Sequence, residues 1–284
     1  MKYMYIKLII SLLFIFSINS SYAFTPQAGT WIITKEMNGK PGRGFSIDVQ
    51  NNTMVMQAWA YEASGQSTFY LASGAYENNN FQGELRRYKG GRYLGSGELT
   101  GTEEPSAGMV RIKFTSGVRG LITLPGESET ELIRFEFGHS KSSPNSLLGT
   151  WSIVGINETT NTSYSDIAVL TKILPATSQG TGVTTNETGS IACEQKKTEI
   201  ITMCLVMRSD TISRKYMFQW SVNRGDGDTY NAAGNYIGPS FANRLREHNM
   251  NYTGVIRTQN MNIDSNSVIS MMDQAWQQSS YSSE

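Results

Sequence analysis

The sequence predicts an all-β protein of two tandem antiparallel β domains, followed by a short C-terminal helix. Three observations predict this fold class. The tripeptide Gly-Thr-Trp occurs twice, at residues 29–31 and 149–151, with its tryptophans 120 positions apart. Apolar and polar residues alternate with period two over short segments that Gly, Asn and Ser separate. Near the end of the chain, apolar residues instead recur at helical spacing.

The chain opens with a segment typical of a cleaved signal peptide. Lys2 and Lys7 precede an apolar run from Leu8 to Ile18, and Ser21-Tyr22-Ala23 has the small-x-small pattern that signal peptidase accepts. We therefore expect residues 1–23 to be removed and the mature chain to be exported, either to the periplasm or out of the cell. The apolar run is shorter than the roughly 20 residues of a membrane helix, so we expect no membrane span.

The first domain is predicted to cover residues 24–140 as an eight-stranded meander barrel. Its strands are expected at 31–34, 45–50, 54–62, 68–76, 81–88, 109–115, 120–124 and 132–137. Eight strands close a small barrel whose interior is filled by its own side chains. In 54–62 both alternating sets are apolar, so we expect both faces to be covered, by the second domain or by a ligand cavity.

The second domain is predicted over residues 146–262, after a linker at 139–145 of Ser, Lys, Asn and Pro. Its strands are expected at 151–156, 167–173, 188–194, 200–208 and 216–223, with a flexible Thr/Gly/Asn-rich stretch at 177–186. Residues 263–284 form the C-terminal helix and tail. Asp264 or Ser265 caps the helix, and one stripe of it carries Val268, Met272, Ala275 and Trp276.

The chain has two cysteines, Cys193 and Cys204, with ten residues between them. An exported protein usually pairs its cysteines, because the compartments outside the cytoplasm are oxidising. The polar residues 196–199 between them suit a hairpin turn. We expect a structural disulfide across this hairpin rather than a redox or metal pair, since a C-x-x-C spacing and a nearby His are lacking.

Charge and histidine content weigh against several classes of function. Without residues 1–23 the chain keeps 22 basic and 24 acidic side chains, which argues against a nucleic-acid binder. Only His139 and His248 are present, so a His-based catalytic triad is hard to build. We assign no catalytic residue, no metal site and no cofactor.

Two further groups of residues keep alternatives open. A glycosidase needs only two carboxylates across a cleft, and the first domain offers Asp48, Glu62, Glu77 and Glu84. In residues 223–228, Arg224-Gly225-Asp226 is the tripeptide that integrin ligands present on a loop. We interpret 224–228 first as a turn, second as a calcium loop using Asp226 and Asp228, and third as an integrin mimic.

Three motifs in the first half resemble a recurrent pattern in uncharacterised exported β-domain proteins of proteobacteria. They are GRGFSI at 42–47, WAYEASG at 59–65 and FYLASG at 69–74, and Phe69 stands where that family usually has Trp. The resemblance covers most of residues 29–138 and implies an exported β protein without an assigned activity. The Gly-Thr-Trp openings are similar to those of calycins, the lipocalins and avidins, which implies a barrel whose open end holds a small apolar ligand.

From these patterns we expect an exported, non-enzymatic binding protein that holds a small apolar ligand or contacts an envelope or host protein. Aromatic side chains supply much of the contact energy in pockets and interfaces. We therefore predict Trp59, Tyr61, Phe69 and Tyr70 as the ligand-binding residues. The alternatives are a hydrolase acting on an envelope glycan through paired carboxylates, and an enzyme inhibitor acting through the loop at 224–228.

Overall fold

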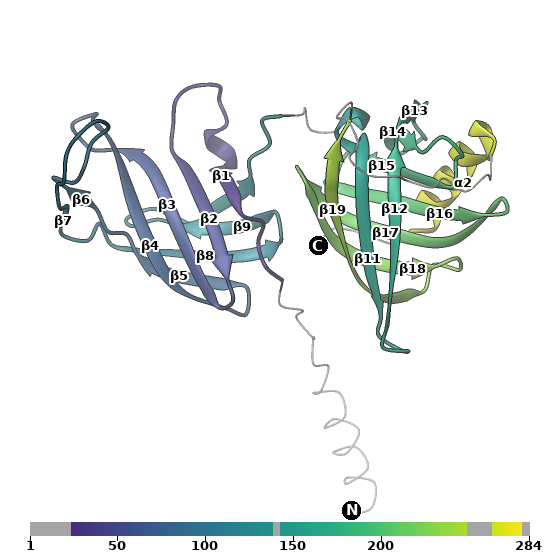
Figure 1. The fold of residues 1–284 in the computed structure, drawn as a ribbon, viewed down its shortest axis with the longest axis horizontal. Helices are drawn as coiled ribbons and strands as arrows, with labels where there is room; N and C mark the ends of the chain where they lie inside the picture. Colours follow the sequence, from purple (N-terminus) through teal and green to yellow (C-terminus); the bar gives the residue numbers. More distant parts are fainter. Residues whose placement is uncertain (1–23, 139–142, 249–262, 280–284) are drawn as a thin grey trace, which may run out of the picture.

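The computed structural model describes residues 24–138, 143–248 and 263–279, which form two β domains and one C-terminal helix (Figure 1). The predicted fold class is confirmed. The predicted signal peptide at 1–23 lies outside the described residues.

The first domain is a closed antiparallel barrel of eight strands in the order β1-β10-β9-β8-β5-β4-β3-β2. A two-stranded hairpin, β6 with β7, interrupts the meander between β5 and β8. The strands are β1 (Gly29–Ile33), β2 (Gly44–Gln50), β3 (Thr53–Tyr61), β4 (Ser67–Glu77), β5 (Asn80–Glu84), β6 (Tyr88–Lys89), β7 (Thr102–Glu103), β8 (Met109–Ser116), β9 (Arg119–Thr123) and β10 (Thr130–Arg134).

Strict alternation of side chains builds this barrel. Along β3 the inward residues Met54, Met56 and Ala58 are buried, whereas the outward residues between them are exposed. The interior is filled by buried side chains from all eight strands, including Trp31, Ile47, Phe81, Phe114 and Leu132. The expectation that both faces of 54–62 are covered is therefore wrong, because only the inward set of β3 is buried.

The second domain is an open, half-barrel sheet of nine strands in the order β12-β11-β19-β18-β17-β16-β15-β14-β13. Its strands are β11 (Gly149–Asn157), β12 (Thr162–Leu170), β13 (Lys172–Leu174), β14 (Gly180–Thr185), β15 (Ile191–Lys196), β16 (Ile201–Arg208), β17 (Thr211–Ser221), β18 (Arg224–Asn231) and β19 (Tyr236–Glu247).

Two predictions for the second domain are wrong. The stretch 177–186 contains β14, and residues 224–228 lie in β18 instead of forming a turn.

The hairpin between β17 and β18 explains the second correction. Ser221 pairs with Arg224, so the turn consists of Val222 and Asn223 alone. The Asp226 carboxylate accepts hydrogen bonds from the Arg224 guanidinium, with Nε to Oδ1 at 2.8 Å. Because Arg224 and Asp226 are held within the sheet, the loop on which the inhibitor and integrin alternatives depended is absent from this hairpin.

In both domains the tryptophan of the repeated Gly-Thr-Trp lies opposite an arginine on the neighbouring strand. Trp31 pairs with Arg134 across β1 and β10, and Trp151 pairs with Arg244 across β11 and β19. In the second domain the Arg244 guanidinium lies 4.1 Å from the Trp151 ring centroid. Each indole Nε1 donates to the carbonyl four residues before it, at 2.9 Å in Trp31 and 2.8 Å in Trp151.

The glycine of each repeat follows from this packing. Gly29 and Gly149 have φ of +120° and +126°, a region that side chains rarely adopt. A Cβ atom on Gly29 would lie 2.3 Å from Nη2 of Arg134. The repeated tripeptide therefore marks the place where an arginine from the last strand of each domain closes against the first strand.

The helix α2 (Ser265–Gln278) packs on the outer face of β14 to β17, behind the second sheet in Figure 1. The Asp264 side chain caps it by accepting from the amides of Asn266 and Ser267. The predicted stripe of Val268, Met272, Ala275 and Trp276 is confirmed as the buried face.

The disulfide between Cys193 and Cys204 is present, and it joins directly opposed residues of β15 and β16.

The two domains touch through the end of the first barrel at which β8 turns into β9. The Gln27 side chain donates through Nε2 to the carbonyl of Arg224 at 3.1 Å. Gly117, in the β8–β9 turn, lies so close to the Asp226 carboxylate that a Cβ atom would be 2.3 Å from its Oδ2. Burial raises the pKa of Asp226, while Arg224 opposes that shift.

Candidate functional site

Three aromatic side chains lie next to one another on the outside of the first barrel. Trp59 of β3 is directly opposite Phe69 of β4, and Tyr61 lies two residues further along β3 on the same face. We call Trp59, Tyr61 and Phe69 the outer aromatic face. Val55 of β3 also points outward and is exposed, which extends the apolar surface along the strand.

Exposure distinguishes Trp59 from the other tryptophans of the chain, and Tyr61 and Phe69 share it, although other aromatics such as Tyr93 and Phe137 are exposed as well. Trp59, Tyr61 and Phe69 are 45%, 49% and 49% exposed. The four other tryptophans, Trp31, Trp151, Trp220 and Trp276, are all buried. Adjacent exposed rings on the outside of a sheet form the kind of apolar patch that marks an interaction surface.

The fourth predicted residue, Tyr70, lies on the opposite side of β4. It is only partly exposed and packs against the barrel core. The predicted set is therefore split between an outer group of three and an inner residue. Since the interior is filled by the barrel's own side chains, the outer group has no access to the space where a calycin-like ligand would bind.

Ion pairs border the outer aromatic face at the end of the barrel where β3 turns into β4. The Glu62 carboxylate follows Tyr61 and lies 2.5 Å from Nη1 of Arg87, whose Nε lies 2.5 Å from Glu104. Lys89 also pairs with Glu104, and a hydrogen bond from Lys89 lowers the pKa of that carboxyl group. These contacts fix the β6–β7 hairpin beside the aromatic rings.

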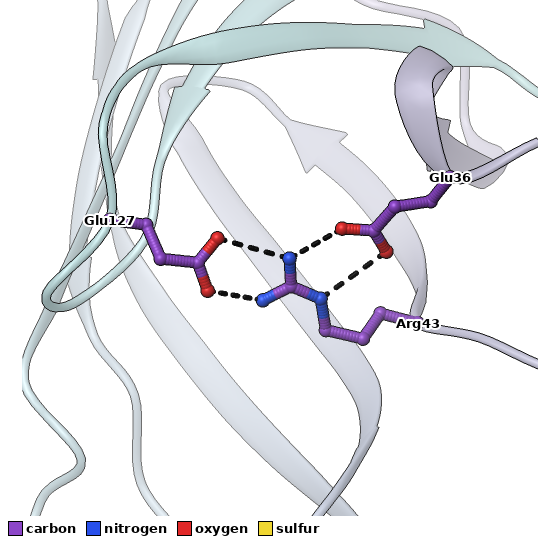
Figure 2. Close-up of polar contacts among 3 residues, drawn as sticks. All are labelled: Glu36, Arg43 and Glu127. Atoms are coloured by element: carbon purple, nitrogen blue, oxygen red, sulfur yellow. Dashed lines mark hydrogen bonds and ion pairs between the residues drawn. The ribbon is translucent and has the colours of Figure 1, made fainter.

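Arg43 ties two further loops together at the same end of the barrel (Figure 2). Its guanidinium bridges Glu36, in the short helix η1 (Thr34–Glu36) after β1, and Glu127, in the loop between β9 and β10. Hydrogen bonds to Glu127 and Glu36 raise the pKa of Arg43. Arg43 in turn lowers the pKa of Glu127 by a hydrogen bond to the ionised carboxylate. The loops around this end are thereby held together by charge-assisted contacts.

The four carboxylates considered for a hydrolase are dispersed and engaged. Glu62 and Glu84 pair with Arg87 and Arg86, and Asp48 accepts from Gln50 at 3.0 Å. Glu77 ends β4, whereas Glu62 lies beside the start of that strand, so these two lie at opposite ends of the barrel. The structure does not bring the four together around one cleft.

Metal ligands are likewise not grouped: the described part of the chain contains no cluster of three or more His, Cys, Asp or Glu side chains that could hold an ion. Asp226 pairs with Arg224, which leaves the calcium alternative without support at that carboxylate. His248 lies at the end of the described segment 143–248, and His139 lies outside the described residues.

No described helix is both long and apolar enough to cross a membrane. The outer aromatic face brings together three of the four residues predicted from sequence as ligand-binding. No family model matches this chain, and no curated protein or solved structure was found to be similar to it.

Proposed function

We propose that the protein is an exported, non-enzymatic binding protein whose outer aromatic face contacts a partner protein. The observation that carries the proposal is the exposure of three neighbouring rings, Trp59, Tyr61 and Phe69, on one face of a closed barrel. Export is supported by the leader-like sequence of residues 1–23 and by the Cys193–Cys204 disulfide.

The energy available from this surface is large enough for a specific contact. An aromatic side chain has about 150–250 Å² of surface to bury, so each half-exposed ring would contribute about 2 kcal/mol on being covered. The Glu62, Arg87 and Glu104 charges border the rings at the end of the barrel where β3 turns into β4. An apolar centre with a charged rim is the usual anatomy of the hot spots in protein interfaces.

A protein partner fits this surface better than a small ligand does. Small ligands bind in concave sites that cover most of their surface. The rings here stand on the convex outside of β3 and β4, and the interior of the barrel is packed. The partner must therefore supply the complementary surface itself.

The proposal is tested by photo-crosslinking in the organism that makes the protein. A photoreactive residue in place of Trp59 should give a discrete adduct, whereas the same residue in place of Lys113, an exposed position of β8, should not. The partner in that adduct is then purified and its dissociation constant measured. Trp59→Ala should weaken binding about 30-fold, the equivalent of 2 kcal/mol. A folded Trp59→Ala protein that binds within threefold of the wild type would refute the assignment.

A further inference from the structure

A cavity of about 250 Å³ lies where the chain leaves the first barrel and meets the second domain. Its first-domain wall is Glu136 and Phe137, which follow β10. Its second-domain wall includes Gln195 of β15, Trp220 of β17, Asn223 of the β17–β18 turn and Glu247 of β19. We call this cavity the interdomain cleft. Ligand sites occur preferentially at such domain boundaries.

Trp220 gives the cleft a rigid wall with an unused hydrogen-bond donor. Its ring is 6% exposed and packs against Trp151, with 3.7 Å between centroids and the ring planes tilted by 53°. Its Nε1 is buried and has no hydrogen-bond partner among the described residues. A buried donor without an acceptor is unfavourable, so a ligand that supplies an acceptor there would gain a hydrogen bond that the protein alone leaves unmade.

The orientation of the ring directs this donor toward the cleft side of the sheet. The Cε3 edge of Trp220 lies against Gly225 of β18, where a Cβ atom would be 2.9 Å away. Nε1 is on the opposite edge of the indole. That edge therefore points away from β18 and toward β16 and β15, the side on which Gln195 lines both the cleft and a neighbouring cavity of about 20 Å³.

The other lining groups complement this donor. Glu136 and Glu247 present carboxylate oxygens, which accept hydrogen bonds. Nη1 of Arg244 lies 3.2 Å from Glu247, and Arg134 interacts electrostatically with Glu136, so arginines balance the charge behind both carboxylates. Gln195 and Asn223 carry amides that can both donate and accept, and Phe137 offers a ring that is 80% exposed.

From this lining we infer that the interdomain cleft binds a small polyhydroxylated molecule such as a monosaccharide. Hydroxyl groups donate to carboxylates and accept from the Trp220 indole and the amides, whereas an ammonium group has no acceptor to offer Trp220. An anion would face two carboxylates. The exposed ring of Phe137 covers an apolar face of such a ligand.

The test is the indole N–H spectrum of the ¹⁵N-labelled mature chain, in which Trp220 is assigned by the signal lost in Trp220→Phe. The probes are methyl α-D-glucopyranoside, benzylamine and benzoate, which are neutral, cationic and anionic. We expect the glucoside alone to shift the Trp220 signal saturably. The Trp276 signal should stay fixed, because its Nε1 donates to Glu194 outside the cleft.

Glu136→Gln provides the matched perturbation, because Glu136 is partly exposed and its replacement leaves the sheets intact. It should weaken glucoside binding about five- to tenfold, since a charge-assisted hydrogen bond becomes a neutral one. The control Glu129→Gln, on an exposed loop of the first barrel, should leave the affinity unchanged.

Three results would overturn the inference. An unchanged affinity in Glu136→Gln would contradict the role of the carboxylate, and a saturable response to benzylamine without one to the glucoside would contradict the ligand class. A Trp220 signal that none of the probes moves would assign its N–H to a water in the neighbouring cavity of about 20 Å³. The exposed Trp59 gives a separate signal, so failure here leaves the outer aromatic face untouched.

Discussion

Glu194 is expected to be one of the most sensitive positions in the second domain. This residue of β15 is fully buried, and its carboxylate accepts four hydrogen bonds. One oxygen accepts from the backbone amides of Thr177 and Gly182 at 3.0 and 3.2 Å. The other accepts from the Thr177 hydroxyl at 2.5 Å and from Nε1 of Trp276 at 3.0 Å. The carboxylate thus links helix α2 to the segment that precedes β14.

Glu194→Gln replaces one acceptor oxygen by an NH₂ group. With the amide nitrogen at the Oε1 position, the backbone N–H groups of Thr177 and Gly182 face another donor. With the nitrogen at the Oε2 position, the Trp276 N–H does, whereas the Thr177 hydroxyl can turn and accept instead. A hydrogen bond to a charged group contributes about 1.5–3 kcal/mol, and removing the buried charge offsets part of the loss. We therefore expect the second domain to lose about 3 kcal/mol. Trp276→Phe removes one donor while keeping an aromatic ring, and it should cost about 1.5 kcal/mol.

Urea unfolding, followed by fluorescence and circular dichroism, measures both effects. With a denaturant dependence of about 1.5–3 kcal/mol per molar, Glu194→Gln should lower the midpoint of the second-domain transition by about 1–2 M. The control is Glu187→Gln, whose exposed pair with Lys172 should contribute less than about 1 kcal/mol. If the two variants unfolded at the same midpoint, the hydrogen bonds to Glu194 would not hold α2 in place.

The remaining predictions concern the disulfide, the barrel rim and the domain contact. Replacing Cys193 and Cys204 by Ala should cost about 3 kcal/mol by the loop-closure relation, measured by urea unfolding with and without reductant. Arg43→Met should destabilise the first domain by about 1–2 kcal/mol at pH 7, with Arg111→Met as the control. Arg43 lowers the Glu127 pKa, so this effect should fade as the pH falls through that lowered pKa. Asp226→Asn should stabilise the protein at pH 7, because burial raises the Asp226 pKa and penalises the ionised form. Its advantage should shrink on acidification through the raised pKa, and a larger difference at low pH would contradict the burial argument.

The first barrel could be predicted from sequence because its strands alternate strictly. In β2, for example, the apolar residues Phe45, Ile47 and Val49 all point inward. This alternation can be recognised in the sequence without knowing which strands lie next to one another. Trp59, Tyr61 and Phe69 could be found as candidates by residue type. Their outward direction could not be found, because both alternating sets of β3 are apolar.

The strands β14 and β18 of the second domain could not be predicted from sequence, because glycine and threonine occupy most of their buried positions. The side chains of Trp220 and Phe218 lie against Gly225, and the backbone of Met217 and Phe218 lies against Gly227, so neither position of β18 has room for a side chain. Read alone, Gly-Asp-Gly-Asp indicates a turn. In β14, Thr184 and Thr185 are buried through hydrogen bonds to the carbonyls of Pro144 and Ile191, so hydrophobic alternation is missing. The residues that line the interdomain cleft are far apart in sequence, so no local sequence pattern predicts it.

Closure of the first sheet restricts how that domain can be recognised. Every strand of the eight-stranded ring has a neighbour on both sides, so its backbone amides and carbonyls offer no edge to which another chain could add a strand. Recognition there has to use side chains. The second sheet ends at β12 and β13. Apart from the two-residue strands of the β6–β7 hairpin, the described chain therefore offers open strand edges for a second copy or an extended peptide only in the second domain.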